Sequence, residues 1–345
     1  MNWQSESVRK WKRESKVKSR KSKAERMEEV YHIPAMLEPT LDGLNIQPGG
    51  TYVDLTFGGG GHSRGILERM GATGGRLFSF DQDMDAYANR IDDPRWQFVH
   101  SNFRNLRNWM DYYGVTELDG ILADLGVSFH HFDSVERGFS FRFAAPLDMR
   151  MNRQQKRTAA QLIAEEDEES LARVLYLYGE LKNGRRLANR ICRSRAIRPI
   201  ETTDQLVAVV LRGGEPPEAL PTGTPIEVAP NEKKDLARLF QALRIELNDE
   251  MGALREMLCA SRALLRPEGR IAILTYHSLE DRLVKNFFRS GNMEGEIEKD
   301  FYGNIVSPFR VIEKGRMADA DEVERNPRSR SAKLRVAARV VPAER

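Results

Sequence analysis

A turn of four consecutive glycines, Gly58–Gly61, follows an apolar segment that ends near Asp54. Glycines in such a turn let the backbone approach a ligand because no Cβ stands in the way. A dinucleotide-binding turn would read G-x-G-x-x-G, but counting from Gly58 and Gly60 the third position is Ser63. An acid that opens the turn instead suits a ligand with an amino-acid end. The pattern therefore predicts an S-adenosylmethionine (SAM) site that includes Asp54, Gly58, Gly60 and Gly61.

Polar residues also end the next three apolar segments. Asp81 closes the second segment, where a carboxylate can accept hydrogen bonds from both ribose hydroxyls of a nucleoside. Asn102 and Phe103 follow the third, where an adenine ring would lie, and Asp124 ends the fourth. The carboxyl ends of parallel strands meet at the edge where open α/β sheets bind ligands. Four such ends in order predict a nucleoside-type site.

Asp124 is the residue expected to carry the chemistry. Methyl transfer from a sulfonium is an in-line displacement, so the protein mainly aligns donor and acceptor and removes a proton. A carboxylate that accepts the N–H of an exocyclic amine returns electron density to the nitrogen. Amino-methyltransferases usually continue with Pro-Pro-aromatic, whereas this chain continues with Leu125-Gly126-Val127. The aromatic ring that stacks on the base must come from Phe129, His131, Phe132 or the helical region that follows.

His277 and Ser278 follow a fifth apolar segment and could face the target base, which makes His277 a second candidate catalytic residue. A histidine that is hydrogen-bonded to hold its loop is the competing interpretation. A Ser-His hydrolase is disfavoured because the G-x-S-x-G elbow is missing. Hydrolysis of a nucleoside triphosphate is disfavoured because the chain has no P-loop.

The elements that position these residues form the pattern of a parallel sheet with crossover helices. The sequence predicts an α/β fold: a mostly parallel, doubly wound, Rossmann-like sheet. Residues 140–240 are rich in helix formers, and Leu239 to about Leu265 repeats leucine and methionine at three- and four-residue steps, which predicts one long helix packed on the sheet. Ser331–Val341 is expected to be an edge or final strand. The other strand candidates are Thr51–Thr56, Arg76–Asp81, Trp96–His100, Gly120–Asp124 and Arg270–Tyr276.

The same pattern divides the chain of 345 residues into three parts. Residues 1–30 hold ten Lys or Arg against five Glu and few aliphatic residues, which predicts a flexible basic arm. Residues 31–139 and 241–345 are expected to form the methyltransferase domain. Residues 140–240 are expected to form an inserted helical domain that binds the substrate.

Composition excludes several other classes. The mean hydropathy is −0.55 and no run approaches the roughly 18 apolar residues of a membrane span, so no membrane association is expected. Cys192 and Cys259 lie outside any C-x-x-C pair, so neither a metal site nor a disulfide framework is indicated. These features favour a cytoplasmic protein, and a homodimer stays open.

Two basic segments are candidates for contact with RNA. Between Glu180 and Arg198 the chain has seven Lys or Arg and one acid. Three of these arginines, Arg186, Arg190 and Arg193, share one face of a predicted helix. Arg328 and Arg330 begin a second strip near the C-terminus. A solvated surface is the alternative for both, but beside a nucleoside-type site they favour binding of RNA phosphates.

Eight motifs together resemble one family, the bacterial ribosomal RNA small-subunit methyltransferase H (MraW) family. The resemblance covers about residues 31–341. The motifs are His32–Leu37, Asp54–Ser63, Asp124–Ser128, Glu136–Phe141, Pro146–Met151, Phe240–Ile245, His277–Arg282 and Asn326–Ser331.

The resemblance implies a class I methyltransferase fold with an inserted helical domain. It implies methylation of the N4 amine of a cytidine in the decoding centre of 16S ribosomal RNA, with SAM as cofactor and the small ribosomal subunit as partner. A pocket glutamine of the family is replaced here by His131, within Phe129–Asp133, which departs from the family's Ser-Pro-Gln-Leu-Asp. The cofactor residues that it implies are Gly60, Gly61, His62, Asp81, Phe103 and Asp124, with His131 at the glutamine position.

Two other functions stay open at this stage. The departures in Phe129–Phe132 would suit a relative that binds SAM and RNA as a ribosome-assembly factor without turnover, for which Asp124→Ala would be silent. A methyltransferase for proteins or small molecules would show no salt-dependent affinity for RNA.

Overall fold

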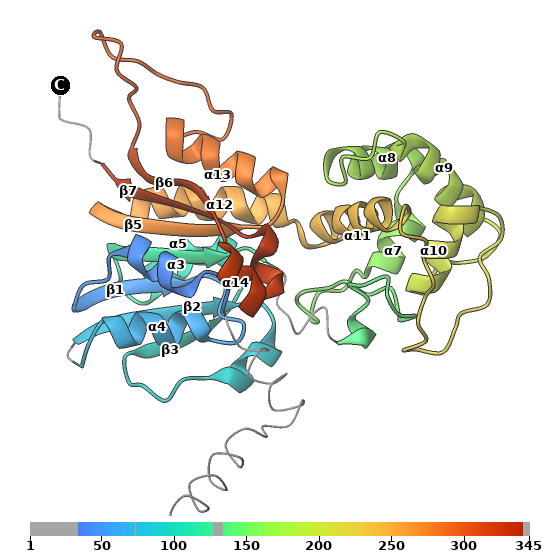
Figure 1. The fold of residues 1–345 in the computed structure, drawn as a ribbon, viewed down its shortest axis with the longest axis horizontal. Coiled ribbons are helices and arrows are strands. Elements are labelled where there is room, and N and C mark those ends of the chain that lie inside the picture. Colours follow the sequence, from blue (N-terminus) through green and yellow to red (C-terminus); the bar gives the residue numbers. More distant parts are fainter. Residues whose placement is uncertain (1–33, 73, 127–133, 341–345) are drawn as a thin grey trace, which may run out of the picture.

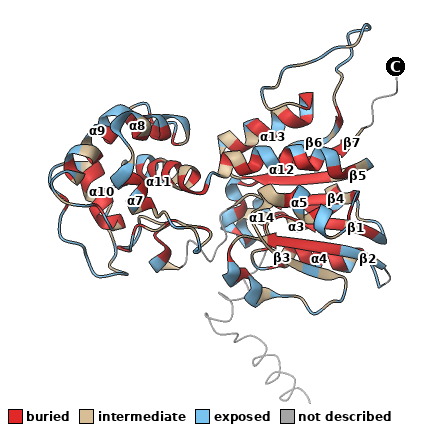
Figure 2. Cartoon of the chain, turned by 180° about the vertical axis from the view of Figure 1, so that it is seen from behind, coloured by how far each residue is buried: buried red, intermediate tan, exposed pale blue. Residues whose placement is uncertain are grey.

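The structure is a computed structural model that describes residues 34–72, 74–126 and 134–340. It has two lobes, one built around a β-sheet and one of helices that come between strands β4 and β5 in the chain (Figure 1). Buried residues line the inner faces of the elements in both lobes (Figure 2). No helix of the described ranges is both long and apolar enough to cross a membrane.

The sheet has seven strands in the order β3-β2-β1-β4-β5-β7-β6. The first five strands pair in parallel, and β7 pairs antiparallel with both β5 and β6. The predicted mostly parallel α/β sheet is therefore confirmed, and each of its five predicted strands overlaps an observed one. The strands are β1 (Gly49–Asp54), β2 (Gly74–Asp81), β3 (Trp96–His100), β4 (Leu118–Asp124), β5 (Leu265–Thr275), β6 (Phe309–Met317) and β7 (Lys333–Arg339).

The C-terminal strand is final in the chain but internal in the sheet. β7 lies between β5 and β6, so the expectation of a final strand was right and that of an edge strand was wrong. This edge of the sheet is formed by β6, a strand that was not predicted from the sequence. Its residues, Phe309 to Met317, include Arg310, Lys314 and Arg316, charged residues of the kind that protect an open edge from pairing with another chain.

Helices cover both faces of the sheet, and the alternation of side chains along each strand feeds two separate cores. On one face Val53 and Phe78 pack with α5 (Leu106–Tyr112), α12 (Glu250–Leu264) and α13 (Ser278–Ser290). On the other face Tyr52 and Leu77 pack with α3 (Leu37–Leu44) and α4 (Gly61–Arg69). The remaining short elements are η1 (Met84–Asn89), η2 (Phe103–Asn105), η3 (Val135–Arg137), α14 (Ala320–Arg325) and η4 (Pro327–Ser331).

The helical lobe has its own core, which runs from Phe139 to Leu247. Local signals begin its helices: Thr158 and Gln161 form a capping box, and the side chain of Asp167 caps the next helix. The helices are α7 (Ala159–Glu165), α8 (Glu168–Leu177), α9 (Gly184–Arg195), α10 (Thr203–Arg212) and α11 (Lys233–Asn248). The domain boundaries and the substrate-binding role predicted for this segment remain predictions.

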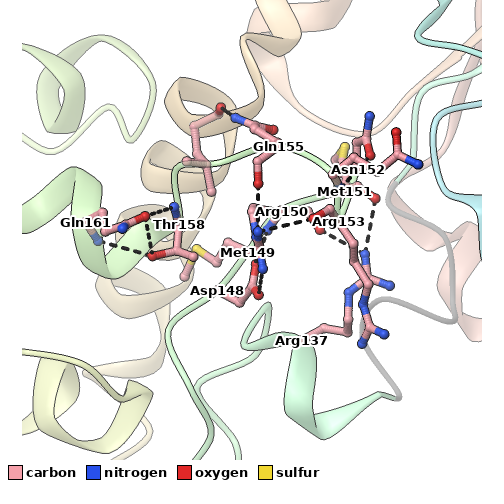
Figure 3. A network of polar contacts seen from close by, with 12 residues as sticks. Arg137, Asp148, Met149, Arg150, Met151, Asn152, Arg153, Gln155, Thr158 and Gln161 are labelled. Carbon is pink, nitrogen blue, oxygen red and sulfur yellow. Dashed lines mark hydrogen bonds and ion pairs between the residues drawn. The ribbon is translucent and has the colours of Figure 1, made fainter.

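A buried arginine joins the entry of the helical lobe to the sheet. The side chain of Arg137 is 1% exposed and donates to a carboxylate oxygen of Asp83, after β2, at 2.8 Å. It also donates to the carbonyl of Arg150 at 2.8 Å, as the network in Figure 3 shows. Asp148 accepts from Arg150 in the same network. The chain that leaves the sheet is therefore held close to the end of β2.

One long helix was predicted from Leu239 to about Leu265, and the structure corrects this. The helix ends at Asn248, and a new one begins at Glu250. Asp249 between them adopts the left-handed conformation, with φ 46°, which aspartate tolerates better than most residues. The break divides the apolar stripe, because Leu243 and Leu247 belong to the core of the helical lobe, whereas Met251, Leu254 and Leu258 pack on the sheet.

Candidate active site

A cavity of about 930 Å³ lies at the carboxyl edge of the sheet and is lined by residues of both lobes. The ends of β1, β2, β4 and β5 contribute one part of its wall. Segments around Phe141 and Phe240 in the helical lobe contribute another, and residues of η4 complete it. The sequence prediction of a site at this edge agrees with the position of the cavity.

Asp54 lies beneath the glycine turn. Its side chain is fully buried and accepts hydrogen bonds from the hydroxyl of Ser63 at 2.6 Å and from the backbone N–H of Thr56 at 3.1 Å. Ser63 also bonds the hydroxyl of Ser79 on the neighbouring strand at 2.7 Å. Burial raises the pKa of Asp54, although His62 and the bond from Ser63 oppose this. Asp54 thus holds the segments on either side of the turn, through Thr56 and Ser63, and is not among the residues that line the cavity.

The glycine turn itself presents backbone to the cavity. Gly58, Gly59 and Gly61 line it, and Gly60 comes directly before α4; Gly58 and Gly60 both have positive φ, 49° and 75°. A Cβ on Gly60 would come within 2.9 Å of the Phe57 ring. The turn therefore needs glycine for its conformation and for its close packing.

Asp81 joins the glycine turn to the end of β2. One carboxylate oxygen accepts from the backbone N–H of Gly58 at 2.9 Å, and the other accepts from the N–H of Asp83 at 2.9 Å. Asp81 lines the cavity together with Asn102 and Phe103 from the end of β3. The three residues predicted for the nucleoside part of a ligand are therefore brought together.

Asp124 ends β4 and borders the same cavity. Its side chain is 21% exposed, and His62 Nδ1 lies 3.9 Å from its Oδ2. The other oxygen, Oδ1, is buried and has no hydrogen-bond partner in the described part of the chain. Burial raises the pKa of Asp124, while His62, Tyr276 and the backbone of Gly126 pull it down. The site thus holds a partly exposed carboxylate with an increased proton affinity.

Tyr276 is a cavity residue that was not singled out in the sequence, although it directly precedes His277. It follows β5, which pairs with β4 so that Leu274 lies opposite Asp124. A Cβ on Gly126 would lie 2.8 Å from the tyrosine ring. Burial raises the pKa of Tyr276 well above its ordinary value, and Asp124 adds to the effect. Its position immediately after a strand was the only available signal.

His277 lines the cavity but uses its ring to begin α13. Nδ1 accepts the backbone N–H of Glu280 at 3.5 Å, and Nε2 lies 3.1 Å from Glu280 Oε1. Glu280 in turn accepts from the backbone N–H of Tyr276 at 2.9 Å. Glu250 lies near both and pairs with Arg244 at 2.7 Å. These contacts match the loop-holding interpretation of His277, and its catalytic role stays a prediction.

The wall from the helical lobe carries aromatic and basic groups. Phe141 is partly buried and packs edge to face on the buried Phe240, with ring centroids 5.6 Å apart. Arg142 beside it is exposed, as are Arg328 and Arg330 of η4, and all three line the cavity. Phe141, Phe240 and Arg142 were missed as site residues because their approach to Asp124 depends on the packing of the two lobes.

The arginines predicted on α9 do not line this cavity. Arg186 and Arg193 are exposed on the helix, whereas Arg190 donates to the carbonyls of Val210 and Leu211 at the end of α10. Arg190 therefore has a structural role as a helix C-cap. The predicted cofactor residue His131, like Phe129 and Phe132, lies outside the described residues.

Sequence comparisons identify the family of the chain. Residues 29–340 match the MraW methylase family. Ribosomal RNA small subunit methyltransferase H of Parabacteroides distasonis is 54% identical over 318 residues, which cover 92% of this chain and all of the relative. The protein of the same name from Phocaeicola vulgatus is 53% identical over 310 residues, 90% of this chain and 97% of the relative. Because the family match covers nearly the whole sequence, the chain belongs to the MraW methylase family.

Proposed function

We propose that this protein transfers a methyl group from SAM to the exocyclic N4 amine of a cytidine in small-subunit ribosomal RNA. The observation that carries the proposal is the carboxylate of Asp124. It lines the same cavity as a glycine turn suited to SAM and a wall of aromatic and basic side chains. The names of the relatives supply the RNA and the ribosomal subunit.

The residues of the glycine half fit SAM. Gly58, Gly59 and Gly61 offer a backbone surface without side chains, and Asp81 offers carboxylate lone pairs for a ribose. The volume of about 930 Å³ is at the upper end of the roughly 300–1,000 Å³ of small-molecule pockets, which favours room for a base beside the cofactor. When bound, SAM supplies an activated methyl group on a sulfonium.

Asp124 is proposed to orient the amine and to receive its proton. The carboxylate would accept one N–H of the amine and increase the electron density on the nitrogen that takes the methyl group, while the sulfonium that loses this group would leave as a neutral thioether. The proton that the nitrogen must lose passes to the carboxylate. A raised pKa suits this step because a carboxylate of higher proton affinity is a better base. His62 lies 3.9 Å from Oδ2 of the carboxylate, and the side chain of Tyr276 is hydrogen-bonded to Asp124.

Phe141 is proposed to supply the ring that the sequence Asp124-Leu125-Gly126-Val127 lacks. A base stacked on an aromatic side chain gains about 1–3 kcal/mol. Phe240 backs the ring and is itself buried, so the platform is held in place. Arg142, Arg328 and Arg330 surround the opening and can neutralise phosphates next to the target nucleotide.

His277 is proposed as a positioning residue. Its contacts with Glu280 fix the turn between β5 and α13 and thereby the position of Tyr276. The cytoplasmic location expected from the sequence belongs to this proposal, and the homodimer stays a prediction.

The direct test is a nucleoside analysis. The protein is incubated with methyl-labelled SAM and small ribosomal subunits from cells that lack it, and the RNA is then digested to nucleosides. We expect label in N4-methylcytidine, and none with the Asp124→Ala variant. Label on another nucleoside would reject the assigned amine. Label in protein would reject RNA as the substrate, and binding without turnover would favour an assembly factor.

A further inference from the structure

The segment between α13 and β6, residues 291–308, forms an arm that projects from the sheet lobe. Figure 1 shows it extending beyond α13, away from the helical lobe, and Figure 2 shows that it is largely exposed. Phe301 is 97% exposed and Tyr302 is 85% exposed at its turn. Their rings pack edge to face with centroids 5.6 Å apart, and Ile305 beside them is 47% exposed. Adjacent exposed aromatic side chains of this kind mark an interaction surface.

The turn that presents these rings is held by several hydrogen bonds. Asp300 Oδ1 accepts from the backbone N–H of Tyr302 at 2.9 Å and of Asn304 at 2.8 Å, and Oδ2 accepts from the Asn304 side chain at 3.1 Å. Lys299 and Ile305 pair across the turn. The conformation of the tip is thus defined before any partner arrives, which lowers the entropy cost of binding.

The base of the arm is also fixed. Asn286 of α13 donates to the carbonyls of Met293 and Glu294 at 3.2 and 3.3 Å. Asn292 accepts from the backbone N–H groups of Gly295 and Glu296 at 2.8 and 3.0 Å. The aromatic tip is therefore carried at a set position relative to the sheet lobe.

The charge of the arm decides which partner suits it. Residues 291–308 contain four acids and one lysine. Three of the acids, Glu294, Glu296 and Glu298, are exposed. Such a surface repels the phosphates of RNA, whereas it complements a basic protein surface. Tyrosine and other large aromatic residues are the side chains that dominate binding energy in protein–protein contacts.

We propose that the tip of the arm docks on a basic protein of the ribonucleoprotein particle that carries the target RNA. This inference rests on the proposed function, because it assumes that the particle is the substrate. RNA then enters at the arginine-lined cavity, and the arm binds protein elsewhere on the same particle. The two contacts together would favour the assembled particle over protein-free RNA.

The test compares two substrates with one variant. The double variant Phe301→Ser/Tyr302→Ser and the wild type are titrated with purified small ribosomal subunits and with protein-free 16S ribosomal RNA. We expect at least about tenfold weaker binding to the particle, which corresponds to about 1.4 kcal/mol, and unchanged binding to the free RNA. SAM affinity should not change, since no residue of the arm lines the cavity. Tyr112→Ser, at a side chain 76% exposed on α5, is the matched control and should have no effect.

Each other outcome overturns the docking proposal. Equal weakening on particle and free RNA would mean that the tip stacks on RNA, and wild-type affinity of the variant for the particle would mean that the tip is not a contact. A second variant, Glu294→Gln/Glu296→Gln/Glu298→Gln, should slow association with the particle, whereas faster association would contradict a basic protein partner. Failure of the proposed function is distinguishable, because the wild type would then form no N4-methylcytidine on either substrate.

Discussion

The two halves of the cavity are built in different ways. In the SAM half, the part of the wall formed by the glycine turn and Asp81, the carboxylate of Asp81 accepts the backbone N–H of Gly58, and the buried carboxylate of Asp54 accepts the hydroxyl of Ser63. In the acceptor half, Phe141 and Arg328 come from segments far apart in the chain and have exposed or partly exposed side chains. The SAM half is thus formed by neighbouring strand ends of one sheet. The acceptor half forms only when the two lobes and the C-terminal segment have packed together.

Asp124 stands where the two halves meet, so its loss should give the largest effect. We expect Asp124→Ala to lower kcat by about 10²–10⁴, the usual contribution of a positioned acid or base. SAM affinity measured by calorimetry should change far less, because the nucleoside contacts at Asp81 remain. Loss of SAM binding to the same degree as activity would instead assign Asp124 to the SAM half alone.

The pH dependence gives a second test of Asp124. Because burial raises its pKa, activity should increase with pH through a midpoint above the ordinary value and then level off, falling about tenfold per pH unit on the acid side. Stability should change in the opposite direction: a carboxyl with a raised pKa in the folded state stabilises it at low pH, and this is lost as pH rises through the folded pKa. Unfolding of Asp124→Asn should lack that contribution. A rate independent of pH in this range would contradict a proton transfer to Asp124.

The rigidity of the SAM half can be tested at a glycine. Gly60→Ala should weaken SAM binding by about tenfold or more, because the new methyl group meets the Phe57 ring and the residue has φ 75°. Gly71→Ala is the matched control, since its φ is 76° and nothing lies within 4 Å of its Cβ. The control should cost about 1–2 kcal/mol of folding free energy and leave SAM affinity unchanged. Equal losses of SAM affinity would show that backbone strain alone explains Gly60.

For the acceptor half, Phe141→Leu should raise KM for RNA about fivefold without changing SAM affinity, because leucine keeps the apolar contact with Phe240 but removes the stacking face. Phe143→Leu offers a control two residues away, at a side chain that is 38% exposed and outside the cavity lining. Steady-state kinetics with RNA distinguish the two. An unchanged KM for Phe141→Leu would remove the stacking role.

The smallest effect is expected at the rim. Arg328→Gln/Arg330→Gln should lower the slope of log affinity against log salt by about 1 for each arginine lost. A filter-binding titration over salt concentrations measures it. The pair Arg186→Gln/Arg193→Gln on α9 sharpens the comparison, since a similar change there would extend the RNA contact across the helical lobe. Arg190→Gln should mainly reduce stability, because Arg190 bonds the carbonyls that end α10.

The comparison also explains what could be predicted from sequence. Asp81 and Asp124 were found because a polar residue at the end of a parallel strand always reaches the same edge. Asp54 was recognised by its place before the glycines, but its position below the turn depends on Ser63 and Ser79. The helical region was left open as a source of the stacking ring, but no local pattern singled out Phe141 within it, because its role depends on which face of the helical lobe turns toward the sheet.

The break at Asp249 escaped prediction for a related reason. The three- and four-residue repeat of apolar side chains continues across it, so a single left-handed residue leaves no mark on the pattern. The edge strand β6 was missed because its alternating charged residues resemble those of a surface loop.

The break between α11 and α12 at Asp249 bears on the width of the cavity. α11 belongs to the core of the helical lobe and α12 to that of the sheet lobe, so a backbone change at Asp249 would rotate one lobe relative to the other. At 1.5 Å per residue α11 is about 24 Å long. A rotation of about 10° about Asp249 would therefore displace its N-terminal end by about 4 Å. The carboxylate of Asp249 forms an ion pair with Arg104, the residue after Phe103, and so links the helix break to the SAM half of the cavity. A change in the backbone at Asp249, which lies outside the cavity lining, would therefore move the cavity residue Phe240 of α11 relative to Asp124.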